Sequence, residues 1–246
     1  MIALIDYGIS NLRSVQKAFE HLGTKVTLVD TPGGVAQAER LILPGVGAFP
    51  AGMLGLRERG LIEPLKQAAR DGKPLIGICL GMQLLFEASD EMGETDGLGL
   101  LPGRVTKIKR QEAGSRRQEA GGRRREAGGG KQEETHSSIV IRHPPQIHAQ
   151  PSQGTHPVLK IPHMGWNQLD RVADHPLVRD LASGSYAYFV HSYAVYPDQR
   201  DLILATTDYG GPFASIVGRG PLCGLQFHPE KSQAVGLKLL KNFLEL

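Results

Sequence analysis

The sequence has little cysteine, no long apolar run and no cluster of metal ligands. Two cysteines, Cys79 and Cys223, in 246 residues exclude a disulfide framework and suit a reducing compartment. No apolar run approaches the roughly 18 residues that a membrane-spanning helix needs. The opening residues, MIALID, start a strand-like run without a basic region or cleavage site, so we expect no signal peptide. These absences favour a cytoplasmic protein with no membrane contact, no metal and no cofactor.

The small net positive charge of +3 comes from one segment. Residues 110–160 hold nine Lys or Arg and five Glu, a balance of +4, which leaves −1 for the rest of the chain. The triplet EAG recurs there at 112–114, 119–121 and 126–128, without the large apolar residues of a coiled-coil seam. This composition predicts a disordered, low-complexity insertion within a single domain spanning 1–246. Its interspersed glutamates and lack of aromatic residues argue against nucleic-acid binding.

The rest of the chain predicts an α/β fold. In the first hundred residues, strand-like and helix-like runs alternate, with strands expected at 2–6, 25–29, 40–43 and 74–79 and helices at 10–22 and 61–70. This alternation is typical of a mostly parallel central sheet flanked by helices. The second half is richer in strands, expected at 186–195, 202–207, 213–217 and 222–227, before an amphipathic helix at 234–243.

Cys79 lies in the sequence GICLG at 77–81, between an apolar strand and a helix-like run. This pattern is typical of a nucleophile elbow, in which the nucleophile stands on a sharp turn above a helix N-terminus. Gly77 and Gly81 leave room for the turn, and the helix N-terminus favours a thiolate. The commoner fate of a single cysteine is burial in a core strand, and we interpret Cys223 in that way.

A histidine and a carboxylate near the C-terminus favour the catalytic interpretation of Cys79. The sequence QFHPE places His228 and Glu230 two residues apart. A cysteine nucleophile needs a base to take and return a proton, and a carboxylate to orient that base. The chain therefore holds all three members of a Cys-His-Glu triad, which favours a thiol hydrolase or transferase.

A second glycine loop, PGVG at 44–47, follows the strand expected at 40–43. Taken alone it is an ordinary connection. Acyl transfer also requires backbone N–H groups directed at the developing oxyanion, and glycine lets the backbone approach or turn. We expect these donors at Val46, Gly47 and Leu80, the last being the residue after the nucleophile.

These three motifs together resemble the class I, or triad, glutamine amidotransferases. The segments PHMGWN at 162–167 and YFVHSY at 188–193 resemble more narrowly the glutaminase subunits of imidazole glycerol phosphate synthase. The resemblance covers everything outside 110–160, and family members run almost directly across that gap. It implies the amidotransferase fold and the hydrolysis of glutamine to glutamate and ammonia. The ammonia is then delivered, in a heterodimer, to a (β/α)8-barrel cyclase that makes imidazole glycerol phosphate in histidine biosynthesis.

By the same resemblance, Cys79 attacks the γ-carboxamide, His228 relays the proton and Glu230 orients the imidazole. The residues implied to hold the substrate glutamine are Gln83, Glu91, His191, Ser192 and Tyr193. Trp166 and Lys231 are implied to face the cyclase. Without the resemblance, Glu91 would be interpreted as a solvated charge, and His191 and Trp166 as core residues.

Two other functions stay open at this stage. The first is an amidotransferase subunit of another pathway, of the anthranilate or aminodeoxychorismate type, or a γ-glutamyl hydrolase; none of these is expected to carry the segment 162–167. The second is a non-catalytic scaffold whose basic insertion contacts nucleic acid or a membrane surface. The intact triad argues against a scaffold without activity.

Overall fold

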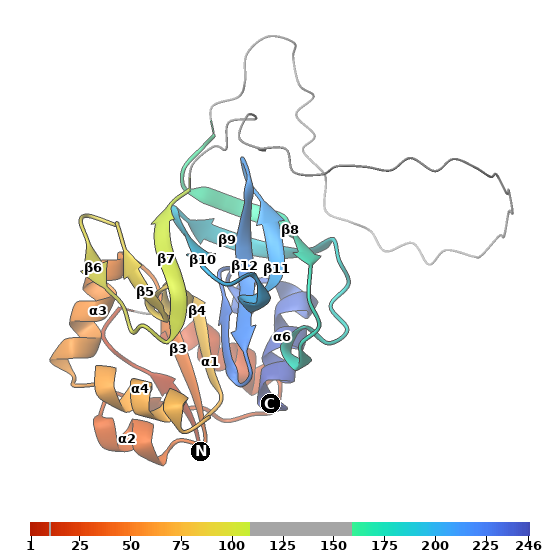
Figure 1. The fold of residues 1–246 in the computed structure, drawn as a ribbon. Coiled ribbons are helices and arrows are strands. Elements are labelled where there is room, and N and C mark those ends of the chain that lie inside the picture. The colour runs from red at the N-terminus through yellow and green to blue at the C-terminus, as the bar shows by residue number, and fades with distance from the viewer. Residues whose placement is uncertain (10, 109–158) are drawn as a thin grey trace, which may run out of the picture. The chain divides into compact units, whose positions relative to one another are not determined.

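A nine-stranded sheet forms the centre of the chain. A computed structural model describes residues 1–9, 11–108 and 159–246, so the predicted insertion lies almost wholly outside the described residues and its disorder stays a prediction. The strand order is β2-β1-β3-β4-β13-β12-β11-β8-β9 (Figure 1). Its strands are β1 (Ile2–Ile5), β2 (Thr27–Val29), β3 (Arg40–Gly45), β4 (Leu75–Cys79), β8 (His163–Arg171), β9 (Ser185–His191), β11 (Ile203–Asp208), β12 (Pro212–Arg219) and β13 (Leu222–Leu225).

The sheet is parallel in one half and antiparallel in the other. Every neighbouring pair from β2 to β13 is parallel, and every pair from β13 to β9 is antiparallel. The α/β fold class is therefore confirmed, and the strand-rich second half of the sequence supplies most of the antiparallel part. A smaller four-stranded sheet has the order β10-β7-β5-β6. It consists of β10 (Tyr193–Pro197), β7 (Leu101–Lys107), β5 (Phe86–Ser89) and β6 (Thr95–Asp96).

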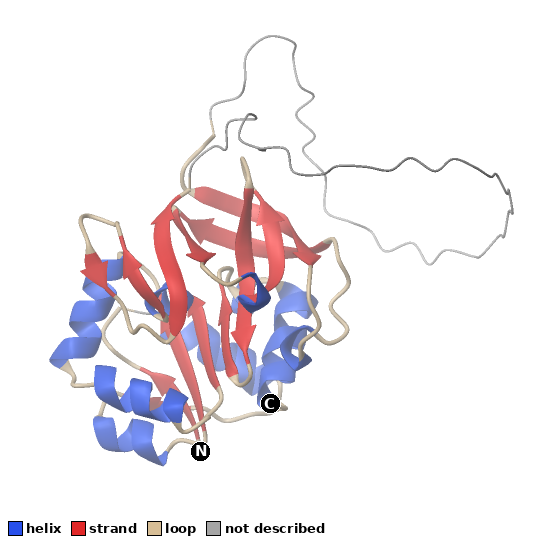
Figure 2. Cartoon of the chain, in the orientation of Figure 1, coloured by secondary structure: helices blue, strands red, loops and turns tan. Residues whose placement is uncertain are grey.

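Helices cover both faces of the parallel half, as Figure 2 shows. Successive residues of a strand point to opposite faces, and the core divides accordingly. Leu41 and Leu43 of β3 share one apolar cluster with α2, α3 and α4, whereas Ile42 shares the other with α1 and α6. The helices are α1 (Leu12–His21), α2 (Pro32–Gln37), α3 (Phe49–Glu58), α4 (Ile62–Arg70), α5 (Leu80–Leu84) and α6 (Gln233–Leu244).

The strand predicted at 186–195 is two strands in different sheets. β9 ends at His191 in the large sheet, and β10 begins at Tyr193 in the small sheet, where it pairs with β7. The carbonyl of Ser192 at the corner accepts a hydrogen bond from the Ile108 N–H (2.9 Å). Apolar and aromatic residues continue through Ser192 on both sides of this corner, so the sequence predicts one continuous strand and does not reveal the change of sheet. Residues 191–193 therefore form the corner between the two sheets.

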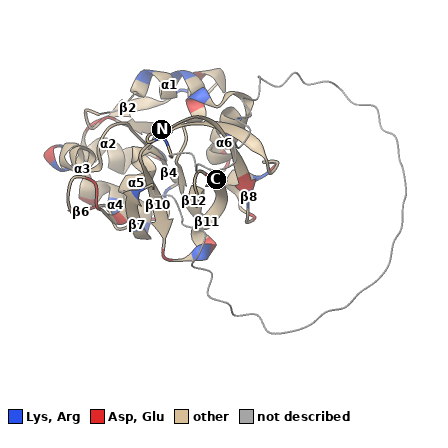
Figure 3. Cartoon of the chain, turned by 90° about the horizontal axis from the view of Figure 1, so that it is seen from above, with Lys and Arg blue, Asp and Glu red and all other residues tan. Residues whose placement is uncertain are grey.

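Charges of both signs are spread over the surface of the described part of the chain (Figure 3). Several form solvent-exposed ion pairs, among them Arg104 with Glu94 and Lys238 with Asp180. Exposed pairs of this kind contribute little to stability. None of the described helices is long and apolar enough to cross a membrane.

Candidate active site

Cys79 occupies a sharp turn between β4 and α5. Its backbone has φ 54° and ψ −111°, a conformation that non-glycine residues rarely adopt. A Cβ added to Gly77 would lie 2.6 Å from the Gly81 carbonyl oxygen and the Met82 nitrogen. One added to Gly81 would lie 1.8 Å from the Leu43 carbonyl oxygen. The turn therefore requires both glycines, as the sequence pattern predicts, and a strained nucleophile backbone is typical of functional sites.

The sulfur of Cys79, at the end of the buried strand β4, lies near two polar groups. The side chain is 6% exposed, and its Sγ lies 3.9 Å from the carbonyl oxygen of Val190 and 3.9 Å from Nε2 of Gln226. Leu80 begins α5, and the first N–H groups of a helix have no intrahelical acceptor. Its N–H therefore needs no acceptor within the helix.

His228 and Glu230 reach the same edge of the sheet as Cys79 because β13 lies parallel to β4. Leu225 pairs with Ile78, so both chains leave the sheet at neighbouring points. His228 Nδ1 lies 2.9 Å from Glu230 Oε1, and the Glu230 side chain is only 1% exposed. The segment is fixed by its backbone, since the His228 N–H donates to the Tyr188 carbonyl (3.0 Å). Ser232 Oγ donates to the His228 carbonyl (2.7 Å).

The electrostatics favour a charged imidazole at His228. Burial by itself disfavours the imidazolium, but interactions with Cys79 and Glu230 outweigh it and raise the pKa of His228 well above its ordinary value. The reason is that a nearby negative charge favours the charged form of an imidazole. A thiolate–imidazolium pair of this kind is the reactive form of a cysteine nucleophile.

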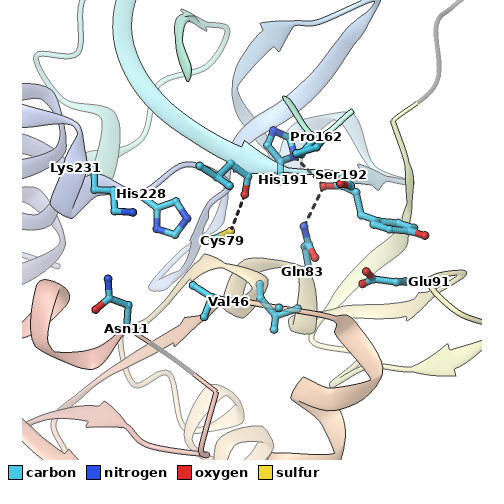
Figure 4. A pocket seen from close by; sticks show the side chains of 14 residues that line it. Asn11, Val46, Cys79, Gln83, Glu91, Pro162, His191, Ser192, His228 and Lys231 are labelled. Carbon is cyan, nitrogen blue, oxygen red and sulfur yellow. Dashed lines mark hydrogen bonds between the residues drawn. The ribbon is translucent and has the colours of Figure 1, made fainter. Parts of the chain in front are cut away.

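A cavity of about 300 Å³ opens beside Cys79 and gathers most of the predicted site residues. In Figure 4, His228 lies next to Cys79, Glu91 lies at the opposite end, and Gln83 lies between Cys79 and Glu91. Of the predicted residues, the lining includes Val46, Gly47, Cys79, Leu80, Gln83, Glu91, His191, Ser192, Tyr193, His228 and Lys231. Glu230, which contacts His228, and Trp166 are not among the residues that line the cavity.

One backbone N–H of the predicted oxyanion loop is already engaged within the protein. The Val46 N–H donates to the Ile9 carbonyl oxygen (3.2 Å) and is therefore occupied. Gly47 has φ 96°, and a Cβ placed there would meet nothing within 4 Å. The other end of the loop is anchored, because the Tyr7 hydroxyl donates to the Pro44 carbonyl (2.6 Å). Burial, and then the nearby Cys79, raise the pKa of Tyr7, so it remains a donor.

Gln83 and Glu91 are both engaged in hydrogen bonds within the protein. Gln83 is 5% exposed, and its Nε2 donates to the Tyr193 carbonyl (3.0 Å). Glu91 Oε2 accepts from the N–H of Phe49 (2.8 Å), the first residue of α3. Glu91 is therefore not only a solvated charge, because it caps a helix N-terminus, where a carboxylate is stabilised.

His191 and His163 form a buried pair across β8 and β9. His163 Nδ1 lies 2.9 Å from His191 Nε2, and His191 Nδ1 lies 2.8 Å from the Tyr193 carbonyl oxygen. A carbonyl oxygen can only accept, so His191 carries its proton on Nδ1 and His163 donates from Nδ1. Burial of the ring, and then its electrostatic interaction with His191, lower the pKa of His163 to about 3. Burial is also the main cause that lowers the pKa of His191 to about 4, so both rings are neutral near pH 7.

Trp166 lies on the exposed face of β8, opposite the side that carries His163. It is 43% exposed and pairs across the sheet with Tyr188, their ring centroids being 5.9 Å apart. Lys231 Nζ lies 5.8 Å from the Tyr188 ring centroid. Met164 and Tyr186, also exposed, extend this apolar face along the same two strands.

Comparison with known proteins gives the family. The family model "Glutamine amidotransferase class-I" matches residues 3–246. A protein of Salinibacter ruber named imidazole glycerol phosphate synthase subunit HisH is 43% identical, and the match covers 100% of this chain and 94% of that protein. The HisH subunit of Syntrophotalea carbinolica is also 43% identical, over 99% of this chain and 98% of its own. The chain belongs to the HisH family of class I glutamine amidotransferases.

Solved structures agree on the fold of this family. The structure titled "Crystal structure of glutamine amidotransferase" has a TM-score of 0.64 at 17% identity, covering 100% of this chain and 98% of its own. The structure of PurLQS from Thermotoga maritima has a TM-score of 0.63 at 19% identity, covering 99% and 97%. At such low identity these likenesses concern architecture alone, and they confirm the predicted amidotransferase fold.

The sequence interpretation missed several residues at this cavity. Asn11, Pro162 and Val190 line the cavity, and Gln226 lies against Cys79. Pro162 and Val190 stand within the quoted segments 162–167 and 188–193, so the signal was present but not used. Asn11 precedes α1 as its N-cap residue, a position that by itself signals only a helix start. Within the described residues, no group of three or more His, Cys, Asp or Glu side chains has the arrangement of a metal site.

Proposed function

We propose that this chain hydrolyses glutamine through Cys79, His228 and Glu230 and delivers the ammonia to a (β/α)8-barrel cyclase. Membership of the HisH family makes it a glutamine amidotransferase of histidine biosynthesis, and the relatives' name as a subunit implies a partner subunit. The observation that carries the triad is the elbow: a cysteine at positive φ, beside a histidine paired to a buried carboxylate.

The proposed reaction proceeds by two acyl transfers. The Cys79 thiolate attacks the γ-carboxamide carbon of glutamine, and the resulting tetrahedral intermediate expels ammonia as His228 donates a proton to it. Water, deprotonated by His228, then attacks the thioester; glutamate leaves and the thiolate returns. Glu230 keeps the imidazole oriented and stabilises its charged form throughout.

The cavity fits glutamine in size and polarity. Glu91, at the end far from His228, supplies a negative charge for the α-ammonium group, in addition to its bond with Phe49. The Gln83 Nε2 donates to protein acceptors, which leaves its Oε1 to face substrate donors. Residues 191–193 supply the wall formed at the corner between β9 and β10. These assignments follow from cavity lining and chemistry together.

The oxyanion hole is half formed in this proposal. Leu80 supplies one N–H at the start of α5, whereas the Val46 N–H donates to Ile9 instead. A turn of the backbone at Val46 and Gly47 would direct an N–H to the intermediate. Gly47, which has open space around it, permits such a turn. We infer that binding of the partner favours the turned state.

The exposed face of β8 and β9 is the surface that we assign to the cyclase. It presents Trp166, Met164 and Tyr186, with Tyr188 and Lys231 beside them. Aromatic side chains are enriched at interface centres. Lys231 also lines the cavity, so a partner on this face would lie next to the site of ammonia release. We place the reaction in the cytoplasm, since the proposed chemistry requires a free thiol.

Glutamine-dependent synthesis of imidazole glycerol phosphate by the mixed subunits tests the proposal. The cyclase should use both glutamine and added ammonia with this chain present, but only ammonia without it. A chain that binds the cyclase without supporting glutamine use would be a scaffold. A chain that hydrolyses glutamine but couples only to the synthase of another pathway would support the anthranilate-type or aminodeoxychorismate-type alternative.

A further inference from the structure

Gln226 lies directly against the nucleophile, and the proposed mechanism gives it no role. It follows β13, is completely buried, and its side-chain amide lies between two groups of the site. Its Nε2 is 3.9 Å from Cys79 Sγ, and its Oε1 is 3.2 Å from Gln83 Nε2. A buried amide is costly unless its donors and acceptor are used, so these two contacts account for its position.

The orientation of the Gln226 amide is fixed, through Gln83, by the backbone carbonyl of Tyr193. The Tyr193 carbonyl oxygen can only accept, and it lies 3.0 Å from Gln83 Nε2. Gln83 therefore turns its NH₂ group toward Tyr193 and, with its second hydrogen, toward Gln226. Gln226 therefore accepts this hydrogen bond through Oε1, and its own NH₂ group faces Cys79.

The same carbonyl is held in place from the other side. His191 Nδ1 donates to it at 2.8 Å, and His191 accepts in turn from His163. His163 Nε2 lies 3.2 Å from Asn167 Nδ2, which also donates to the Asp208 carbonyl (2.9 Å). The Tyr193 carbonyl is thus anchored by two donors, and the orientation of Gln83 and Gln226 does not depend on substrate.

We propose that Gln226 donates a hydrogen bond to the Cys79 thiolate and stabilises it, with Gln83 and the Tyr193 carbonyl as positioning groups. A hydrogen bond to an ionised acceptor is about twice as strong as one between neutral groups, and burial strengthens it further. The thiolate then has donors on two sides, His228 and Gln226. This inference takes from the proposed function only that Cys79 is the nucleophile.

The pH dependence of Cys79 alkylation tests this role without glutamine or a partner. The full chain is treated with iodoacetamide over a pH series, and modification is measured at the Cys79 peptide by mass spectrometry. Gln226→Met keeps the shape of the side chain but removes the donor. Gln226→Glu keeps an acceptor for Gln83 and places a carboxylate against the sulfur. Ser215→Ala, a buried change beside the Gln226 backbone on β12, is the matched control.

We expect the alkylation midpoint to rise by about one pH unit in Gln226→Met, or about tenfold less thiolate below the midpoint. Gln226→Glu should raise it further, and Ser215→Ala should leave it unchanged. In glutamine turnover, Gln226→Met should lower kcat while KM changes little. Unchanged midpoints in both Gln226 variants overturn the proposal, as does an equal shift in Ser215→Ala.

Gln83→Met provides the test if neither Gln226 variant folds, as judged by circular dichroism. Loss of the orienting donor frees the Gln226 amide to turn, so the midpoint should rise by a smaller amount, and an unchanged midpoint overturns the proposed relay. A chain that shows these shifts yet hydrolyses no glutamine contradicts the proposed function alone. The proposed role of Gln226 and the proposed function are therefore contradicted by different results.

Discussion

Two glycine turns flank the cavity, and they are built in opposite ways. The elbow at 77–81 is closed by contacts on both sides, since a Cβ on Gly77 or Gly81 would collide with backbone atoms. In the loop at 44–47, Gly47 has open space around it, and the Val46 N–H is bonded to Ile9, away from the reaction. The elbow is packed at both of its glycines. The loop is packed at Gly45 and anchored where Tyr7 donates to Pro44, but it is open at Gly47, beside the Val46 N–H that donates to Ile9.

The difference separates two requirements of catalysis. The proposed nucleophile, its base and the orienting carboxylate are in place in the structure of the chain alone. The second oxyanion donor is not, and a single hydrogen bond of about 1 kcal/mol is easily exchanged for another. A subunit built in this way can keep its thiolate ready while hydrolysing little glutamine until a partner shifts the loop.

The largest expected effect is at the elbow itself. Cys79→Ala should lower glutamine hydrolysis by about 10⁶-fold, the loss typical of removing the nucleophile of a triad. Ammonia release measures this, and circular dichroism and cyclase binding should be unchanged. Added ammonia should still support the cyclase. Cys223→Ser is the control, because Cys223 is fully buried and its burial raises the pKa of that thiol to about 12. Comparable losses at both cysteines would contradict the assignment.

The next prediction compares the two turns directly. Gly81→Ala places a Cβ 1.8 Å from the Leu43 carbonyl oxygen, so β3 and α5 must separate, and we expect a loss of more than about 4 kcal/mol in unfolding free energy. Gly47→Ala meets no atom within 4 Å and should cost about 1–2 kcal/mol through its positive φ alone. Urea unfolding of both variants measures this. Equal losses would mean that the loop is packed as tightly as the elbow.

Activation by the partner should be about 10²–10³-fold in kcat for glutamine, the value of one oxyanion donor. The reason is the occupied Val46 N–H, which must leave the Ile9 carbonyl before it can reach the intermediate. Steady-state ammonia release is compared with and without the cyclase and its ligand. The rate of Cys79 alkylation serves as the control and should change far less. Full turnover in the isolated chain would contradict the proposal that the second oxyanion donor is missing without the partner.

Trp166→Ala should weaken association with the cyclase by about 2 kcal/mol, because a half-exposed aromatic side chain at an interface centre is a common hot spot. Isothermal titration calorimetry with the purified barrel measures this. Val172→Ala, an exposed apolar residue after the end of β8, is a control that should bind normally. A Trp166 variant that binds normally but melts much lower would place this residue in a structural role.

The smallest effect concerns the neutral histidine pair, which lies outside both turns. The folded pKa values of His163 and His191, about 3 and 4, lie below the unfolded value of about 6.5. The folded state then binds fewer protons, so this stability is present above pH 6.5 and is lost as pH falls toward 4 and 3. His163→Gln should make the fall in unfolding free energy between pH 6 and 4 shallower by at most about 1.4 kcal/mol per pH unit. Identical slopes would mean that His163 is protonated in the fold.

The elbow and the His228–Glu230 pair could be predicted because their geometry is local. Glycines on both sides of Cys79 are required by contacts within a few residues of the turn and with the next strand, and two residues separate the histidine from its carboxylate. The two strands predicted as one at 186–195 show the limit of such patterns. The run of apolar and aromatic residues continues across Ser192, and the pairing of β10 with β7 reveals the corner.

The sequence by itself determined the fold class and indicated the proposed nucleophile and its partners, since short-range spacing and alternation specify these. Only the tertiary structure decided that Gln226 lies against Cys79, that His163 meets His191, and that the Val46 N–H is bonded to Ile9. Each of these contacts joins residues at least 28 positions apart. Sheet register and loop packing bring them together, and no local pattern encodes either.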